Sequence, residues 1–224
     1  MLINDSKKDT VLKIWGRPSA YNVQKVLWFI DELRLEYEHI EVGSVEGELD
    51  SKEFIAMNPH ARIPVMKDGD LIVWESNTII RYLASEYGRD LYWVENPADR
   101  TLVERWVDWE LASLQPDFLS LFWANFRTPE NQRDAVKIEY FVKRCERNLT
   151  ILNDCLKNSS FVAGSEFSIA DISVGTMFYR YFNMGVSTPE LPNVNRWYER
   201  LTIRPAYQKN IMFPFEELRG RLEF

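Results

Sequence analysis

The sequence predicts an α/β N-terminal domain followed by an all-α C-terminal domain. Strand signals alternate with amphipathic helical signals as far as Gly88, and only helical periodicity continues after that residue. A chain of 224 residues is long enough for one small domain and one medium-sized domain. We therefore expect domains over residues 11–88 and 99–224, joined by a linker over 89–98.

The first elements form a strand–helix–strand unit. Residues 11–15 are a short apolar run that ends at Gly16 and Pro18, which is typical of a buried strand followed by a turn. Apolar residues then recur every three or four positions over 20–35, with polar residues between them, and this predicts an amphipathic helix. Residues 37–42 have the length of a second strand, which the right-handed crossover rule makes parallel to the first.

Four more elements complete the N-terminal domain: a short helix, two strands of a hairpin and a final helix, over 52–57, 63–67, 71–74 and 76–88. Ser51 precedes the short helix, and Pro59 ends it because a residue before proline avoids the α region. Asp68-Gly69 between apolar runs predicts an antiparallel hairpin. Ser76 is expected to cap the last helix, which stops at Gly88.

The remaining chain is predicted as helices over 99–125, 129–156, 169–182 and 194–204, followed by a less regular tail over 205–224. Ser168 and Asp171 precede an apolar run with the spacing of a capping box. Asp171 stands where Glu or Gln is commoner, and we expect it to cap and support folding rather than to act in catalysis.

Composition and charge exclude several classes of protein. There are 27 Lys and Arg residues against 34 Asp and Glu, so the net charge of −7 disfavours binding to nucleic acid or to anionic membranes. No apolar stretch reaches the ~18 residues of a membrane span. Residues 1–10 lack the apolar run of a secretion signal. These observations predict a soluble, cytoplasmic protein.

Cysteine and histidine are scarce. Cys145 and Cys155 lie ten residues apart on one predicted helix, hence about 15 Å apart along its axis, which exceeds the reach of a disulfide. His39 and His60 are the only histidines, and no spacing typical of a metal site occurs. We therefore expect neither a disulfide nor a bound metal.

Particular residues strengthen the prediction of this domain order. The block from Asn58 to Leu83, Asn-Pro-His-Ala-Arg-Ile-Pro-Val-Met-Lys-Asp-Gly-Asp-Leu-Ile-Val-Trp-Glu-Ser-Asn-Thr-Ile-Ile-Arg-Tyr-Leu, is similar to the cis-proline loop, hairpin, Glu-Ser pair and third helix of the soluble glutathione transferases. The loop over 16–26 resembles the bacterial and theta-like branch, which has an N-terminal serine, and 161–164 and 168–172 match the C-terminal domain. The resemblance spans 11–204 and implies a thioredoxin-like fold for the N-terminal domain.

This resemblance implies a glutathione transferase, which activates the thiol of glutathione as a thiolate for attack on a small, apolar electrophile. Its co-substrate is glutathione, and no metal is implied. Ser19 would donate a hydrogen bond to the sulfur, although a serine before a helix is also what an N-cap looks like. The Asn22 amide is the alternative donor. Tyr21 lies closer to the helix than the family's catalytic tyrosine, so we interpret it as packing or as part of the substrate wall.

The resemblance also implies how glutathione is held. A cis peptide at Pro64 would expose the backbone of Ile63, so that an extended peptide can pair with it as an added strand. The alternative is an ordinary trans proline at the start of a strand.

The charged ends of glutathione would meet the two loops on either side of the hairpin. Glu75 would bind the γ-glutamyl ammonium, while Ser76 and the helix N–H groups would bind its carboxylate. His60 and Arg62 would face the glycyl carboxylate. The alternatives are that Ser76 is only a cap and that the loop cations are only solvated.

The second substrate would lie between the domains, against aromatic side chains at Phe122, Trp123, Phe126 and Tyr179. Arg127 and Arg180 would favour an acidic or polarised electrophile. The alternative is that these aromatic residues belong to the core. The C-terminal tail, with Phe213, Phe215 and Phe224, is a further segment whose relation to the site stays open.

Two other functions fit the same fold. One is a glutathione-dependent disulfide reductase or peroxidase, although the N-terminal domain contains no cysteine. The other is a non-catalytic binding or interaction module, against which Ser19 and the Glu75-Ser76 pair argue. The resemblance implies a homodimer, with the region around Arg81 near the other subunit.

Overall fold

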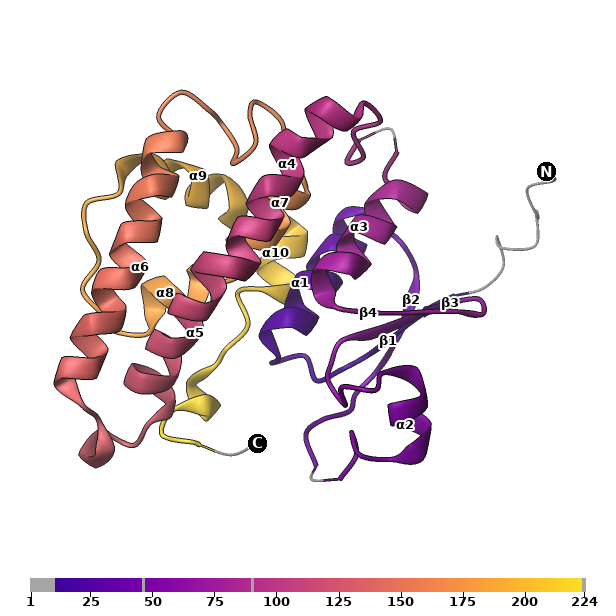
Figure 1. The fold of residues 1–224 in the computed structure, drawn as a ribbon, viewed down its shortest axis with the longest axis horizontal. Helices are drawn as coiled ribbons and strands as arrows, with labels where there is room; N and C mark the ends of the chain where they lie inside the picture. The colour runs from indigo at the N-terminus through magenta and orange to yellow at the C-terminus, as the bar shows by residue number, and fades with distance from the viewer. Residues whose placement is uncertain (1–10, 46, 90, 223–224) are drawn as a thin grey trace.

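The N-terminal half of the chain is built on a four-stranded sheet (Figure 1). The structure is a computed structural model that describes residues 11–45, 47–89 and 91–222. The expectation of no secretion signal over 1–10, and the tail residue Phe224, lie outside these residues. The elements in chain order are β1 (Leu12–Trp15), α1 (Tyr21–Glu32), β2 (Tyr37–Ile40), α2 (Lys52–Met57), β3 (Val65–Asp68), β4 (Leu71–Trp74) and α3 (Ser76–Tyr87).

The strands lie in the order β2-β1-β3-β4. Strand β1 pairs parallel with β2 and antiparallel with β3, and β3 pairs antiparallel with β4. Both the parallel unit and the hairpin predicted from the sequence are therefore confirmed. The peptide bond between Ile63 and Pro64 is cis, as expected.

Helix α1 is buried on more sides than the sequence predicted. It packs against α3, α7 and α10, so Gln24 and Lys25, which the pattern put on its polar side, are buried with exposures of 1% and 0%. The helix was expected over 20–35 but ends at Glu32, and Arg34 takes a left-handed conformation with φ of 55°. This helix is the central element between the sheet and the C-terminal helices (Figure 1).

The expectation that Ser76 caps α3 is wrong, and so is the alternative in which Ser19 caps α1. The N-cap of α1 is Ala20, which has no side chain able to cap, so Ser19 is not the cap. The N-cap of α3 is Glu75, with φ of 70°, and Ser76 is the first residue of the helix. Ser51 does cap α2, by accepting a hydrogen bond from the Phe54 N–H. Both serines next to the expected glutathione site are therefore free of capping roles.

The C-terminal half is helical, which confirms the predicted fold class. Its elements are α4 (Pro97–Trp109), a π-helix η2 (Glu110–Leu114), α5 (Gln115–Phe122), a second π-helix η3 (Trp123–Arg127), a 3₁₀ turn η4 (Glu130–Gln132), α6 (Ala135–Cys155), α7 (Ile169–Gly175), α8 (Phe178–Asn183), α9 (Pro192–Thr202), α10 (Pro205–Asn210) and a 3₁₀ turn η5 (Glu216–Leu218). Within the described residues, no helix has both the length and the apolar character needed to cross a bilayer.

The predicted helix over 99–125 differs most from the structure. It begins at Pro97, inside the expected linker, and two π-helical segments interrupt it. Pro116 has no N–H to donate to the carbonyl four residues earlier, so a regular α-helix cannot continue through it. The π segment ends two residues before this proline, and such wide turns are common at functional sites.

Other boundaries also differ, among them that of the strand expected over 63–67, which starts at Val65. Helix α6 starts at Ala135 rather than 129, and the predicted helix over 169–182 is broken after Gly175. The tail contains α10 and η5, which the sequence did not predict. Cys145 and Cys155 are both free on α6, as expected.

The capping box at the start of α7 is confirmed. The Asp171 carboxylate accepts hydrogen bonds from the backbone N–H groups of Val162 and Ser168, both at 2.9 Å, and from Trp197 Nε1 at 2.8 Å. It is fully buried. Asp171 thus joins α7, α9 and the loop before α7.

We expect Asp171→Asn to lower the free energy of unfolding by about 2–3 kcal/mol, because an amide keeps one acceptor oxygen and turns N–H groups towards donors. Chemical denaturation measures this loss. Asp154→Asn, the same change at an exposed position of α6, is the matched control and should change the free energy by less than about 0.5 kcal/mol. Equal effects of the two variants would contradict the structural role of Asp171.

Candidate active site

A pocket of about 470 Å³ lies where the two halves of the chain meet. The N-terminal half contributes Arg17, Ser19, Ala20, Tyr21, Asn22, Leu49, His60, Ala61, Arg62 and Ile63. The C-terminal half contributes Gln115, Leu119, Phe122, Trp123, Arg127, Arg180 and Leu218. The structure therefore brings together residues from the β1–α1 turn, the loop before β3, α5, η3, α8 and the tail.

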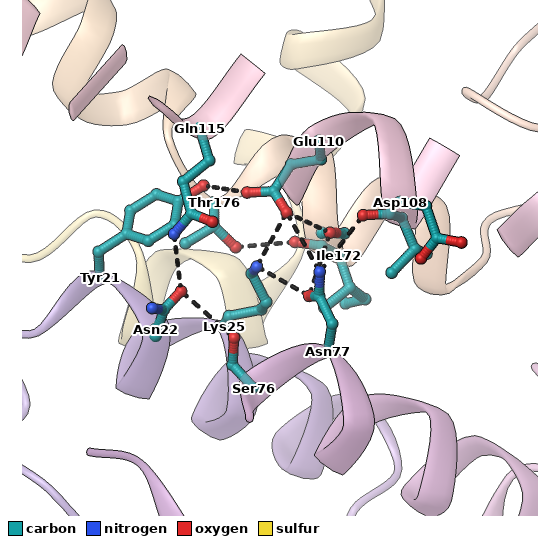
Figure 2. Close-up of polar contacts among 12 residues, drawn as sticks. Tyr21, Asn22, Lys25, Ser76, Asn77, Asp108, Glu110, Gln115, Ile172 and Thr176 are labelled. Atoms are coloured by element: carbon teal, nitrogen blue, oxygen red, sulfur yellow. Dashed lines mark hydrogen bonds and ion pairs between the residues drawn. The ribbon is translucent and has the colours of Figure 1, made fainter. Parts of the chain in front are cut away.

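The two expected sulfur ligands, Ser19 and Asn22, both line this pocket. Asn22 Oδ1 accepts a hydrogen bond from Ser76 Oγ at 3.2 Å and another from Gln115 Nε2 at 3.1 Å (Figure 2). These two contacts orient the amide. Neither the Asn22 Nδ2 group nor the Ser19 hydroxyl hydrogen-bonds to a described residue. Each therefore has hydrogen-bonding capacity left for a ligand.

The loop before β3 presents Ile63 to the pocket. Asn58, which is buried, holds this loop: its Nδ2 donates to the Arg62 carbonyl at 2.8 Å and its Oδ1 accepts from the His60 N–H at 3.0 Å. Neither backbone polar group of Ile63 bonds to another described residue. The His60 and Arg62 side chains are exposed at the pocket rim. Pro64 itself is buried and does not line the pocket.

Glu75 and Ser76 lie at the start of α3, outside the pocket lining. The Glu75 side chain is exposed, and its backbone has a positive φ that a non-glycine residue rarely adopts. Ser76 is 6% exposed and reaches the site through its bond to Asn22.

Two of the four expected aromatic residues reach the pocket. Phe122 and Trp123 line it, whereas Phe126 is fully buried and stacks on Phe122 at 5.1 Å between ring centroids. Tyr179 packs edge-on against Phe215 and does not line the pocket.

The tail borders the site as well. Phe215 packs at a tilt against both the Phe122 and Phe126 rings, and Leu218 of η5 lines the pocket. Phe213 is partly exposed. Leu218 is therefore part of the pocket wall, and Phe215 packs behind that wall against Phe122.

The charged side chains that line the pocket, within the described part of the chain, are basic. Arg127 and Arg180 are 1% and 4% exposed, and burial lowers the pKa of each guanidinium to about 10. Arg17, which the sequence analysis did not single out, lies on the same pocket. The sequence signal for Arg17 is its place in the run Gly16-Arg17-Pro18, directly after a strand.

A fully buried polar cluster lies beside the pocket and joins the two halves of the chain (Figure 2). Lys25 Nζ is 3.1 Å from Glu110 Oε2 and 2.9 Å from Asn77 Oδ1. The other Glu110 oxygen accepts from the Tyr21 hydroxyl at 2.8 Å, and Ser173 Oγ donates to Oε2 at 2.8 Å. Tyr21 is therefore a pocket wall whose hydroxyl is bound to Glu110.

The sequence analysis missed this cluster and Gln115. Lys25 and Glu110 are polar residues in amphipathic helices, and their spacing is equally compatible with a solvated face. Cys145 and Cys155 are not among the described residues that line the pocket, and burial raises the pKa of the Cys145 thiol to about 12. A protein thiol is therefore not part of the described site.

Comparison with known proteins matches both halves of the chain. A family model of the N-terminal domain of glutathione S-transferases matches residues 10–85, and one of the C-terminal domain matches residues 92–200. The chain is 38% identical over 206 residues to glutathione S-transferase GstB of Escherichia coli, covering 91% of this chain and 99% of that protein.

Solved structures agree with this assignment. The theta class glutathione S-transferase of Xanthomonas axonopodis pv. citri, solved with glutathione bound, superposes with a TM-score of 0.86 at 39% identity, covering 91% of this chain and 98% of that one. The glutathione transferase BmGSTD1 of Bombyx mori gives a TM-score of 0.84 at 26% identity, covering 94% and 97%. The paired domains, the pocket between them and these matches show that the chain belongs to the glutathione S-transferase family.

Proposed function

We propose that this protein binds glutathione extended across the Ile63 backbone, ionises its thiol beside Ser19 and Asn22, and conjugates glutathione through its sulfur to a small electrophile in the same pocket. The observation that supports this most concerns the Ser19 hydroxyl, the Asn22 amide and the Ile63 backbone, which lie on one pocket and have no hydrogen-bond partner for these donors or this backbone among the described residues. An extended peptide pairs with such a segment as an added strand does.

The ends of glutathione are assigned by charge. Glu75, at the strained start of α3, would bind the γ-glutamyl ammonium, and Ser76 with the first N–H groups of α3 would bind the adjacent carboxylate. The exposed basic side chains of His60 and Arg62 would face the glycyl carboxylate. The electrophile would lie against Phe122 and Trp123.

The sulfur chemistry needs a thiolate at neutral pH, and a free thiol has a pKa near 8.5. Hydrogen bonds from the Ser19 hydroxyl and the Asn22 amide favour the charged form, because they are made to the anion. Holding the sulfur and the electrophile in one site adds the effect of proximity. Phe126 and Tyr179 would then support the pocket from behind.

Titration of the protein–glutathione complex tests this function. The ultraviolet absorbance of the thiolate, followed against pH, should give a thiol pKa below that of free glutathione. Conjugation of an aryl halide should follow the same titration. Absence of glutathione binding would contradict the assignments of Ile63, Glu75 and Ser76, whereas binding without a lowered thiol pKa would contradict those of Ser19 and Asn22.

Gln115 provides a prediction about the orientation of Asn22. Gln115→Leu removes one of the two donors to Asn22 Oδ1 and should lower kcat/KM about tenfold, because the amide can then rotate away from the sulfur. In an Asn22→Ala background the same substitution should cost no further activity. Steady-state kinetics of the four proteins measure this coupling. An equal loss with and without Asn22 would instead mean that Gln115 contacts substrate directly.

The proposal includes a homodimer in the cytoplasm, where glutathione is kept reduced. Arg81, expected near the other subunit, forms ion pairs with Asp108 and Glu104 of the same chain. Apolar side chains nonetheless remain exposed on β4 and near the end of α3, at Leu71, Ile72 and Tyr87. Sedimentation equilibrium should give twice the chain mass of 26.5 kDa.

A further inference from the structure

Arg180 of α8 is a buried cation on the wall of the active-site pocket. Its side chain is 4% exposed and lines the pocket. Nη2 donates to the backbone carbonyl of Ser19 at 2.7 Å and to Gln24 Oε1 at 2.9 Å. The guanidinium also lies 5.5 Å from the centroid of the Phe122 ring. The side chain thus crosses from the C-terminal half to the turn that carries Ser19.

The groups that hold Arg180 are neutral. Among the described residues, no carboxylate forms an ion pair with it. Arg17 and Arg127 act on it repulsively and, together with burial, lower the pKa of its guanidinium. A buried charge without a counter-charge is costly. An anion bound in the pocket beside Arg180 would therefore offset part of this cost.

The position of Arg180 indicates which anionic group of glutathione it would contact. The two carboxylates of glutathione are assigned to the start of α3 and to the exposed rim at His60 and Arg62. Arg180 instead contacts the residue whose hydroxyl is assigned to the sulfur. The donors already assigned there, Ser19 and Asn22, are neutral and supply no positive charge.

We propose that Arg180 is the counter-charge of the glutathione thiolate, a role that rests on the proposed function. The S–H bond breaks with its proton released to water, and the electron pair remains on sulfur beside the guanidinium. The sulfur then forms a bond to the electrophilic carbon, and the leaving group departs with its own electron pair. A cation in a partly dehydrated site stabilises the charged sulfur more than a neutral donor does.

Three variants test this role. Arg180→Gln removes the charge, Arg180→Lys keeps it, and Gln24→Met removes the hydrogen bond to Gln24 but leaves the charge in place. Arg180→Gln should raise the pKa of the bound thiol by about one unit and lower kcat/KM at neutral pH about tenfold, with recovery at high pH. Arg180→Lys should restore most of the lowered thiol pKa. Gln24→Met should lower the melting temperature without moving the thiol pKa.

A second measurement uses only the wild-type protein, so it does not depend on whether an Arg180 variant folds. Glutathione sulfonate carries a permanent negative charge at sulfur, whereas S-methylglutathione is neutral there, and the wild-type protein should bind the sulfonate at least about tenfold more tightly. An unchanged thiol pKa in Arg180→Gln, or equal affinities for the two analogues, overturns the proposal. Loss confined to electrophiles that carry a carboxylate would overturn it too, by assigning Arg180 to the second substrate.

The two levels of failure are distinguishable. If the wild-type complex shows no lowered thiol pKa, the proposed thiolate chemistry fails, and the role of Arg180 fails with it. If the wild-type complex shows the lowered pKa and Arg180→Gln retains it, only the role of Arg180 fails.

Discussion

Replacing both sulfur donors, Ser19→Ala with Asn22→Ala, is expected to lower kcat/KM for conjugation by about 10³-fold at neutral pH. Removing one preorganised donor from a developing or bound anion commonly costs about 10²–10³ in rate, and effects of groups that act together are not additive. The pKa of the bound thiol should return towards its value in solution. Stopped-flow or steady-state rates measured across pH, together with thiolate absorbance, give both quantities.

The single variants rank the two donors. Ser19→Ala should raise the thiol pKa more than Asn22→Ala if the hydroxyl is the principal donor, and the reverse order would assign that role to the amide. Ser165→Ala, the same change at an exposed position outside the pocket, should leave the rate and the thiol pKa unchanged. Wild-type activity in the double variant would remove both residues from the site.

Glu110→Gln should lower the free energy of unfolding by about 3–5 kcal/mol. Lys25 and Glu110 are both fully buried at 3.1 Å from each other, and removing one partner leaves the other charge buried without compensation. Burial already lowers the pKa of the Lys25 ammonium, and Glu110 opposes that effect. Equilibrium denaturation monitored by tryptophan fluorescence and by circular dichroism measures the loss.

The control for this prediction removes both charges. Lys25→Met with Glu110→Leu replaces the pair by apolar side chains of similar size and should be less destabilising than Glu110→Gln alone. Asn77, Ser173 and Tyr21 lose a partner in the double variant, so some cost remains. A double variant as unstable as the sum of its single variants would mean that the two charges do not stabilise each other.

The buried cluster also bears on activity. Asn77 follows Ser76 on α3, and Glu110 lies in the π segment directly before Gln115. The residues that fix the cluster are thus chain neighbours of those that orient Asn22 (Figure 2). We infer that variants of the pair which still fold will lose part of their activity because Asn22 is less well oriented.

The sequence by itself determined the class of the fold and most of its first half. Periodicity and turn residues predicted the parallel unit, the hairpin and the switch to helices after Gly88, because these are local signals carried by neighbouring residues. The resemblance of the Asn58–Leu83 block to the glutathione transferases implied the cis peptide at Pro64 and an exposed Ile63 backbone, and the structure has the cis bond with Ile63 on the pocket. These predictions depend on short stretches of chain, so they can be made without knowing how the elements pack.

The burial of α1 shows that the hydrophobic pattern of one helix does not predict which of its polar residues are buried. Lys25 occupies a position that the pattern assigns to solvent, yet its ammonium contacts Asn77 of α3 and Glu110 of η2, which lies 85 residues away in the chain. Pro116 is visible in the sequence, but the π segment that precedes it and the second π segment after Phe122 are not predicted by helical periodicity. A helical pattern therefore predicts that a polar residue is exposed, and only the tertiary structure shows whether other elements bury it.

Some residues of the candidate site were predicted from the sequence, and others are known only from the tertiary structure. The resemblance of residues 16–26 and 58–83 to the glutathione transferases predicted Ser19, Asn22 and the loop before β3 as site residues, and the structure brings them to one pocket. Only the tertiary structure shows that Gln115 and Arg17 line the pocket and which groups hold Arg180. It also shows that Phe126 and Tyr179 do not line the pocket. Which face of a C-terminal helix meets the N-terminal domain depends on long-range packing, and no local spacing of residues specifies it.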